Sequence, residues 1–169
     1  MKAVEAAVRV ATGQPGPPRS GWLAFTLAGA AAFWTTNLAI SLTPVAAAYR
    51  AAMSIEYVAM LVEAAVGGVV LAGVVALLLV RFPHRVPGTG PVSRAMLLAT
   101  CALVVVTLAL EVPAKLGADV DDPFRWLLVA TAFNAIRVLA LGLAIGLVAR
   151  AGEARRRSPR AAESKERTS

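Results

Sequence analysis

The hydrophobic residues of this chain are gathered into long blocks separated by polar connectors. The four blocks run over residues 22–42, 57–80, 95–110 and 126–149. A helix needs about 20 apolar residues, at about 1.5 Å each, to cross the hydrocarbon layer of a membrane. The first, second and fourth blocks reach that length. The third block, residues 95–110, reaches it once the charged residues that flank it are included, because their side chains can extend to the interface. The pattern predicts four transmembrane helices, near residues 22–42, 56–80, 94–112 and 124–149.

Composition places the chain among integral membrane proteins. It has 169 residues, 58% of them hydrophobic, with a mean hydropathy of +0.69. Such a composition is far from that of water-soluble domains, and the length suits a single domain. We therefore predict an all-α integral membrane protein with a segment 1–21, a four-helix transmembrane domain 22–149, and a charged tail 150–169 that lacks apolar periodicity and is expected to be disordered.

Basic residues are unevenly divided between the two ends of the predicted helices. Thirteen of the 17 Lys and Arg residues lie in segments 1–21, 81–94 and 150–169, whereas three lie in the other two connectors. Positively charged loops stay in the cytoplasm. The split predicts an antiparallel bundle with both termini cytoplasmic, in a multi-pass protein of the bacterial inner membrane.

The net charge of +7 belongs mainly to this cytoplasmic rim. Basic residues that flank membrane spans control topology and contact anionic lipid headgroups. We expect the lipid bilayer and its anionic headgroups to be the partners of this rim, and we do not expect nucleic acid to be one.

The first outer connector carries a helix signal of its own. Thr43 can cap a helix whose first residue is Pro44, an arrangement typical of helix starts. The stretch 45–53 that follows is rich in alanine, the strongest helix former. We predict a short interfacial helix here rather than a simple connector.

Four polar residues lie within the predicted spans, at related depths. Glu63 and Arg137 are single charges in the second and fourth spans, and Asn37 and Asn134 are amides in the first and fourth. The helical rise places all four between the outer interface and the membrane midplane. A charge at that depth usually faces the protein interior and has a partner. We therefore predict that Glu63 and Arg137 form an ion pair, with the two amides completing its hydrogen bonds.

This intramembrane polar cluster has two interpretations. It can be a satisfied network that fixes helix register, or a substrate or proton site that opens outward. Elsewhere, Glu111 and Lys115 are four residues apart and predict an ion pair at the outer end of the third span. Gly142 and Gly146 have the spacing that lets transmembrane helices approach closely.

No catalytic set, metal-ligand spacing or cofactor motif appears in the sequence. The leading hypothesis is an accessory or binding subunit of a membrane complex or homo-oligomer, without enzymatic activity. A small transporter or channel built around Glu63 and Arg137 is the alternative, and a membrane lipid-modifying enzyme is the second. An accessory protein predicts a dry, closed bundle, whereas the alternatives predict a cleft that reaches Glu63.

Overall fold

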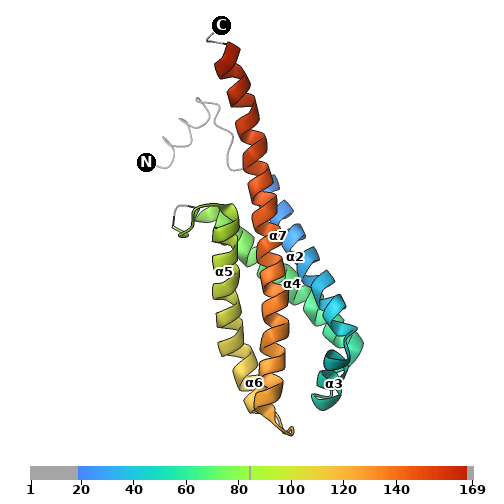
Figure 1. Ribbon diagram of the computed structural model, residues 1–169. Helices are drawn as coiled ribbons and strands as arrows, with labels where there is room; N and C mark the ends of the chain where they lie inside the picture. The colour runs from blue at the N-terminus through green and yellow to red at the C-terminus, as the bar shows by residue number, and fades with distance from the viewer. Residues whose placement is uncertain (1–18, 84, 167–169) are drawn as a thin grey trace, which may run out of the picture.

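The computed structural model describes residues 19–83 and 85–166, and this part of the chain is helical with no strand. Its elements, in chain order, are α2 (Arg19–Ser41), α3 (Pro44–Ala52), α4 (Tyr57–Arg81), α5 (Pro91–Val106), η1 (Thr107–Glu111), α6 (Val112–Leu116) and α7 (Pro123–Glu166) (Figure 1). The label η1 denotes a single π-helical turn. Most of the predicted N-terminal segment lies outside the described residues.

Four helical stretches are long and apolar enough to cross a membrane, as predicted. They are Gly21–Ser41, Tyr57–Arg81, Pro91–Leu116 and Pro123–Arg155. Large apolar side chains remain exposed along all four, which water-soluble monomers rarely show. Examples, one from each stretch, are Leu27, Val58, Leu108 and Ile136. The helices and their exposed apolar faces indicate a multi-pass membrane protein.

The third spanning helix continues beyond the predicted end at residue 112. Pro113 was expected to stop it, because proline lacks an N–H and its ring clashes with the carbonyl four residues earlier. In the structure the helix widens just before the proline, where the Val112 N–H donates to the Thr107 carbonyl, five residues back. Such π turns are frequent at functional sites. The widened turn carries the helix past Pro113 to Leu116.

The fourth spanning helix also continues, as α7, to Glu166. Residues 150–169 were expected to be disordered because they lack apolar periodicity. This segment is rich in Ala, Arg and Glu, which are strong helix formers. A helix that already exists in the span needs only to propagate, because its nucleation cost has been met. A missing apolar stripe argues against packing but does not prevent helix formation.

The short helix predicted in the first outer connector is present as α3. The Thr43 hydroxyl accepts a hydrogen bond from the Ala46 N–H at 3.2 Å, and Pro44 occupies the first helical position. Cap and proline therefore act together to start a helix of nine residues.

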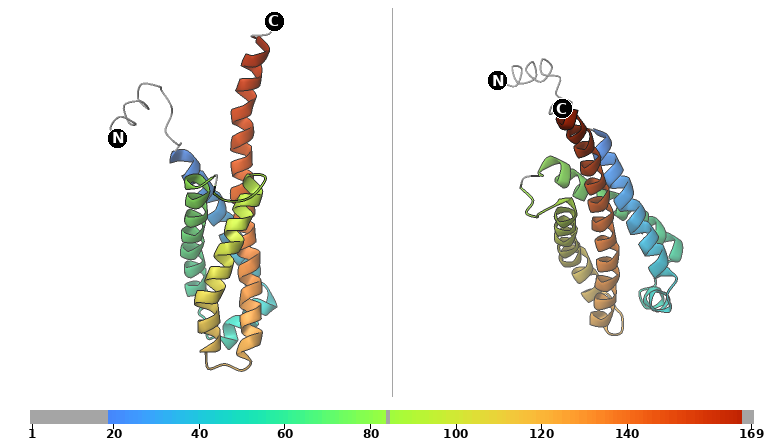
Figure 2. Two further views of the ribbon diagram at one scale, coloured as in Figure 1. Left: turned by 90° about the vertical axis from the view of Figure 1, so that its left-hand side faces the viewer. Right: turned by 45° about the horizontal axis from the view of Figure 1, so that its top comes forward.

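The four long helices do not contact one another equally. α2 packs along both α4 and α7, α5 packs along α7, and α4 and α7 scarcely touch each other. The connectors at 42–56 and 117–122 lie at one end together with α3 and α6, and the extension of α7 leaves the opposite end (Figures 1 and 2). We call the first of these the α3 end. α4 and α7 are thus joined mainly through α2.

Small residues bring α5 and α7 into close contact. A Cβ atom added at Gly142 would lie 2.6 Å from the Ala99 Cβ, and one added at Gly146 would lie 2.7 Å from the Val92 Cα. Ala95 and Ala99 on the α5 side of this contact are fully buried. The glycine pair recognised in the sequence therefore packs within the chain, and it is not left as a free face for a neighbour.

Candidate functional site

All four polar residues predicted within the spans line one cavity of about 390 Å³ at the α3 end. Asn37 comes from α2, Glu63 from α4, and Asn134 and Arg137 from α7. α3, η1 and α6 complete the wall. Asn37 is only 2% exposed, whereas Glu63 is exposed. The similar depths estimated from the helical rise are thus accompanied by a shared cavity.

Arg137 is held by neutral groups. Its Nη1 donates to the Asn37 Oδ1 at 2.8 Å, and its Nε donates to the carbonyl of Phe133, one turn earlier on α7, at 3.1 Å. The guanidinium also lies over the Phe33 ring, with 5.8 Å between Cζ and the ring centroid. These contacts orient the side chain but do not neutralise its charge.

The predicted direct ion pair between Glu63 and Arg137 is not formed, and this prediction was wrong. Within the described residues the only ion pair is Lys115–Glu111. The reason lies in the helix arrangement, because α4 and α7 scarcely touch and α2 packs against both. Residue spacing and helical rise give the depth of a residue but not the neighbour that its helix faces. Asn37 of α2 therefore takes the position expected for the carboxylate.

A second polar group on the cavity wall is centred on Glu111. Its Oε1 accepts a hydrogen bond from the Asn134 Nδ2 at 3.0 Å, and its Oε2 lies 3.8 Å from the Lys115 Nζ. The Glu111–Lys115 ion pair was predicted, but as an isolated interfacial contact. The π turn ends at Glu111. Because such a turn shifts the face that a helix presents, regular spacing could not place Glu111 beside Asn134.

An aromatic cluster attaches α3 to this wall. The Tyr49 ring packs against Trp126 and Phe133, with centroids 6.0 and 6.1 Å apart, and the Lys115 Nζ lies 5.2 Å from its centroid. Tyr49 also lines the cavity. This role of Tyr49 was not predicted, although the sequence places an aromatic residue in the short predicted helix.

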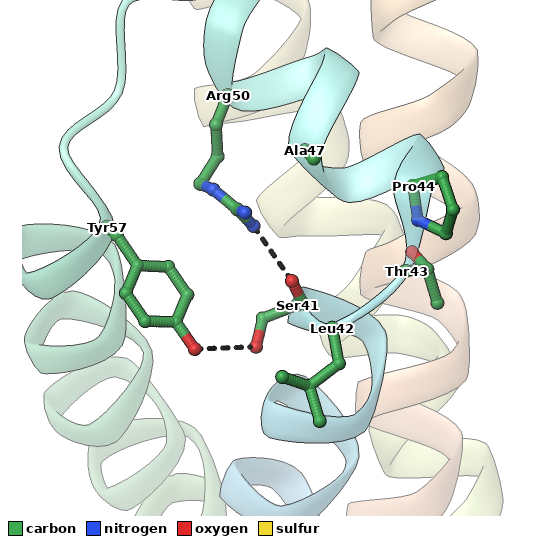
Figure 3. A pocket seen from close by; sticks show the side chains of 7 residues that line it. All are labelled: Ser41, Leu42, Thr43, Pro44, Ala47, Arg50 and Tyr57. Carbon is green, nitrogen blue, oxygen red and sulfur yellow. Dashed lines mark hydrogen bonds between the residues drawn. The ribbon is translucent and has the colours of Figure 1, made fainter.

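The other side of α3 is held by polar contacts, shown in Figure 3. The Arg50 Nη1 donates to the Ser41 carbonyl at 3.0 Å, and the Ser41 and Tyr57 hydroxyls are 3.3 Å apart. Arg50 also lies over the Tyr57 ring, 4.8 Å from its centroid. These contacts join the end of α2 to the start of α4 and fix α3 over the cavity.

Two polar atoms on the cavity wall have no hydrogen-bond partner within the described chain. The Asn37 Nδ2 is buried and makes no hydrogen bond, and the Glu111 Oε2 accepts none. Arg137 uses two of its five N–H groups in the hydrogen bonds above. A buried donor without a partner is costly. The cavity therefore presents unused donors from α2 and α7 and carboxylates from α4 and η1.

Glu63→Gln tests the corrected arrangement. Since Glu63 is exposed and makes no ion pair with any residue that the structure describes, we expect its replacement to change the free energy of unfolding by less than about 0.5 kcal/mol. Denaturant unfolding in detergent micelles measures this value. A loss of about 3–5 kcal/mol, the cost of leaving a buried charge without its partner, would contradict this arrangement and indicate that Glu63 and Arg137 do form a direct ion pair.

No family model, curated protein or solved structure matches this chain. Within the described residues, no group of three or more His, Cys, Asp or Glu side chains is arranged to hold a metal ion. The polar groups that line the cavity are amide, guanidinium, ammonium, carboxylate and hydroxyl groups.

Proposed function

We propose that this protein is an antiparallel four-helix bundle of the bacterial inner membrane, with both termini cytoplasmic, that binds a small anionic group in the cavity at its α3 end. The distribution of basic residues supports this orientation, in which the cavity faces outward. The basic rim then contacts anionic lipids on the cytoplasmic side.

One observation carries the proposal. Arg137 lines the cavity with no carboxylate of the described residues within ion-pair distance, and beside it the buried Asn37 Nδ2 has no hydrogen-bond partner among them. A guanidinium with free N–H groups binds phosphate and carboxylate in two-point geometry. An anion in the cavity would accept hydrogen bonds from both residues and neutralise the arginine.

The shape of the cavity favours binding over a dry accessory role. A closed bundle was the expectation for an accessory subunit, and the cavity reaches Glu63 instead. Farther from the α3 end, the helices are tightly packed around Val75, Leu141 and Ile145, which are at most 1% exposed. This packing closes the bundle beyond the cavity toward the end opposite α3, which suits a binding protein better than a channel.

A thermal shift with soluble probes tests this function. The full chain in a neutral detergent is heated with O-phosphoethanolamine, with glycerol 3-phosphate, or with glycerol as the neutral control. Ligand at a hundred times its Kd adds about 2.7 kcal/mol of stability, so both phosphates should raise the melting temperature by about 5 °C or more. Glycerol should not raise it.

Arg137→Lys serves as the matched variant. It keeps the charge but removes the guanidinium fork, and we expect it to lose most of the shift given by phosphate. Its own melting temperature reports whether it folds. Equal shifts for both phosphates and glycerol, or an unchanged phosphate shift in a folded Arg137→Lys protein, would contradict the proposal.

A further inference from the structure

A long apolar groove adjoins the polar cavity. It has a volume of about 620 Å³ and is formed mainly by α4 and α5, with Phe33, Asn134 and Val138 at its base. The groove and the cavity share four lining residues, which are Phe33, Gly67, Leu110 and Asn134. A Cβ atom added at Gly67 would have no neighbour within 4 Å, so this junction is open.

The groove has the length and direction of a lipid chain. On α4 its lining runs from Gly67 to Leu78, away from the polar cavity, and on the facing helix it runs from Leu110 of η1 back to Leu98 of α5. Eleven steps along a helix cover about 16 Å. One leaflet contributes half of a hydrocarbon layer about 30 Å thick, or about 15 Å. The groove is therefore about as long as one acyl chain, and a headgroup in the cavity would place its chain there, along the half of α4 farther from the α3 end.

The side chains at the rim show which medium the groove faces. Val70, Val74 and Val105 line the groove and are 61%, 46% and 64% exposed. Apolar residues this exposed on membrane-length helices face the acyl chains of the bilayer. The groove thus opens sideways between α4 and α5 toward lipid, and a lipid can enter it without leaving the membrane.

The charges of the cavity select the headgroup. Glu111 and Lys115 pair with each other, which leaves Arg137 and Glu63 as the cation and the carboxylate without an ion-pair partner among the described residues. A phosphate would complement Arg137, and an ammonium group would complement Glu63. A purely anionic headgroup leaves Glu63 unsatisfied, and a quaternary ammonium group has no N–H to donate to it.

We infer that the site holds a zwitterionic aminophospholipid of the phosphoethanolamine type. Its phosphate binds Arg137 and the Asn37 amide, its ammonium group binds Glu63, and one acyl chain lies in the groove between α4 and α5. This assignment rests on the proposed anion-binding function and adds the identity of the ligand.

Competitive lipid binding tests the assignment. The delipidated full chain is mixed with equal amounts of palmitoyl-oleoyl phosphatidylethanolamine, phosphatidylglycerol and phosphatidylcholine. Bound lipids are then identified and quantified by native mass spectrometry. We expect one phosphatidylethanolamine to be retained at least about tenfold over the other two, because it alone forms charge-assisted hydrogen bonds at both ends of its headgroup. Glu63→Gln should bring that preference over phosphatidylcholine close to parity.

Ala102→Trp places a large side chain in the groove. Val104→Trp is its control, since Val104 lies on the same helix but lines neither the cavity nor the groove. Only the first should lower lipid retention, and by about tenfold or more. Wild-type protein that binds the three lipids equally, or Ala102→Trp that retains lipid normally, would overturn the inference. A dimer that Ala102→Trp dissociates would likewise overturn it, by making the groove a subunit interface. If one of these results is found but O-phosphoethanolamine still raises the melting temperature, only the lipid assignment is contradicted and the proposed anion-binding function is kept. If O-phosphoethanolamine does not raise the melting temperature, both the function and the lipid assignment are contradicted.

Discussion

Replacing Asn37 with leucine is expected to destabilise the protein by about 2–4 kcal/mol. Asn37 is almost fully buried, and its Oδ1 is the only side-chain acceptor bonded to the Arg137 guanidinium in the described part of the chain. Leucine has a similar volume but no acceptor, so the arginine keeps its charge and loses its partner. Denaturant unfolding in detergent micelles measures the loss.

Two comparisons separate this effect from a general effect of leucine on α2. Thr35→Leu changes an exposed residue on the same helix and should leave stability within about 0.5 kcal/mol of wild type. Adding Arg137→Leu to Asn37→Leu removes the orphaned charge and should recover part of the loss. Equal stabilities for Asn37→Leu and Thr35→Leu would show that the hydrogen bond does not hold Arg137 in place.

Replacing Gly142 with leucine is expected to cost about 3 kcal/mol or more and to separate α5 from α7. The Cβ atom alone would meet the Ala99 Cβ at 2.6 Å and the Ala95 carbonyl oxygen at 3.3 Å. A backbone carbonyl cannot move aside as a flexible side chain can. The same unfolding measurement applies, with Gly152→Leu as the control on the same helix, because nothing lies within 4 Å of its added Cβ.

A compensating substitution makes this test specific. Gly142→Ala alone should destabilise the protein, and Gly142→Ala combined with Ala99→Gly should regain most of the loss, because the second change removes the methyl group that the first one meets. If Gly142→Leu and Gly152→Leu unfold alike, the close contact between α5 and α7 is not formed.

Features that depend on local sequence were predicted well. Block length gave the four membrane-length helices, and the cap and proline at Thr43 and Pro44 gave α3. The C-terminal ends of the third and fourth spanning helices were predicted too early, for different reasons. At Pro113 the helix avoids the proline clash because a π turn precedes the proline. The residue pattern used to predict the helices does not identify such a turn. After residue 150, helix propagation from the span outweighs low hydrophobicity.

Features that depend on which helices face each other could not be read from one sequence. Helical rise gives depth, and depth correctly brought Asn37, Glu63, Asn134 and Arg137 to one cavity. It says nothing about rotation of the helices or their order around the bundle. The structure joins α4 to α7 mainly through α2, so the arginine meets an amide and not the predicted carboxylate. The apolar groove was missed for the same reason.

The most direct test is whether the polar cavity is open to water on the outer face. Cys101→Ala first removes the single native cysteine. A cysteine is then placed at Met60, which lines the cavity, or at Val69, which is 52% exposed but lines neither the cavity nor the groove. Intact cells are treated with a membrane-impermeant maleimide. We expect labelling at residue 60 and none at residue 69, whose surroundings are lipid. Labelling at residue 60 only after the membrane is permeabilised, or equal labelling at both positions, would contradict an outward-facing polar site.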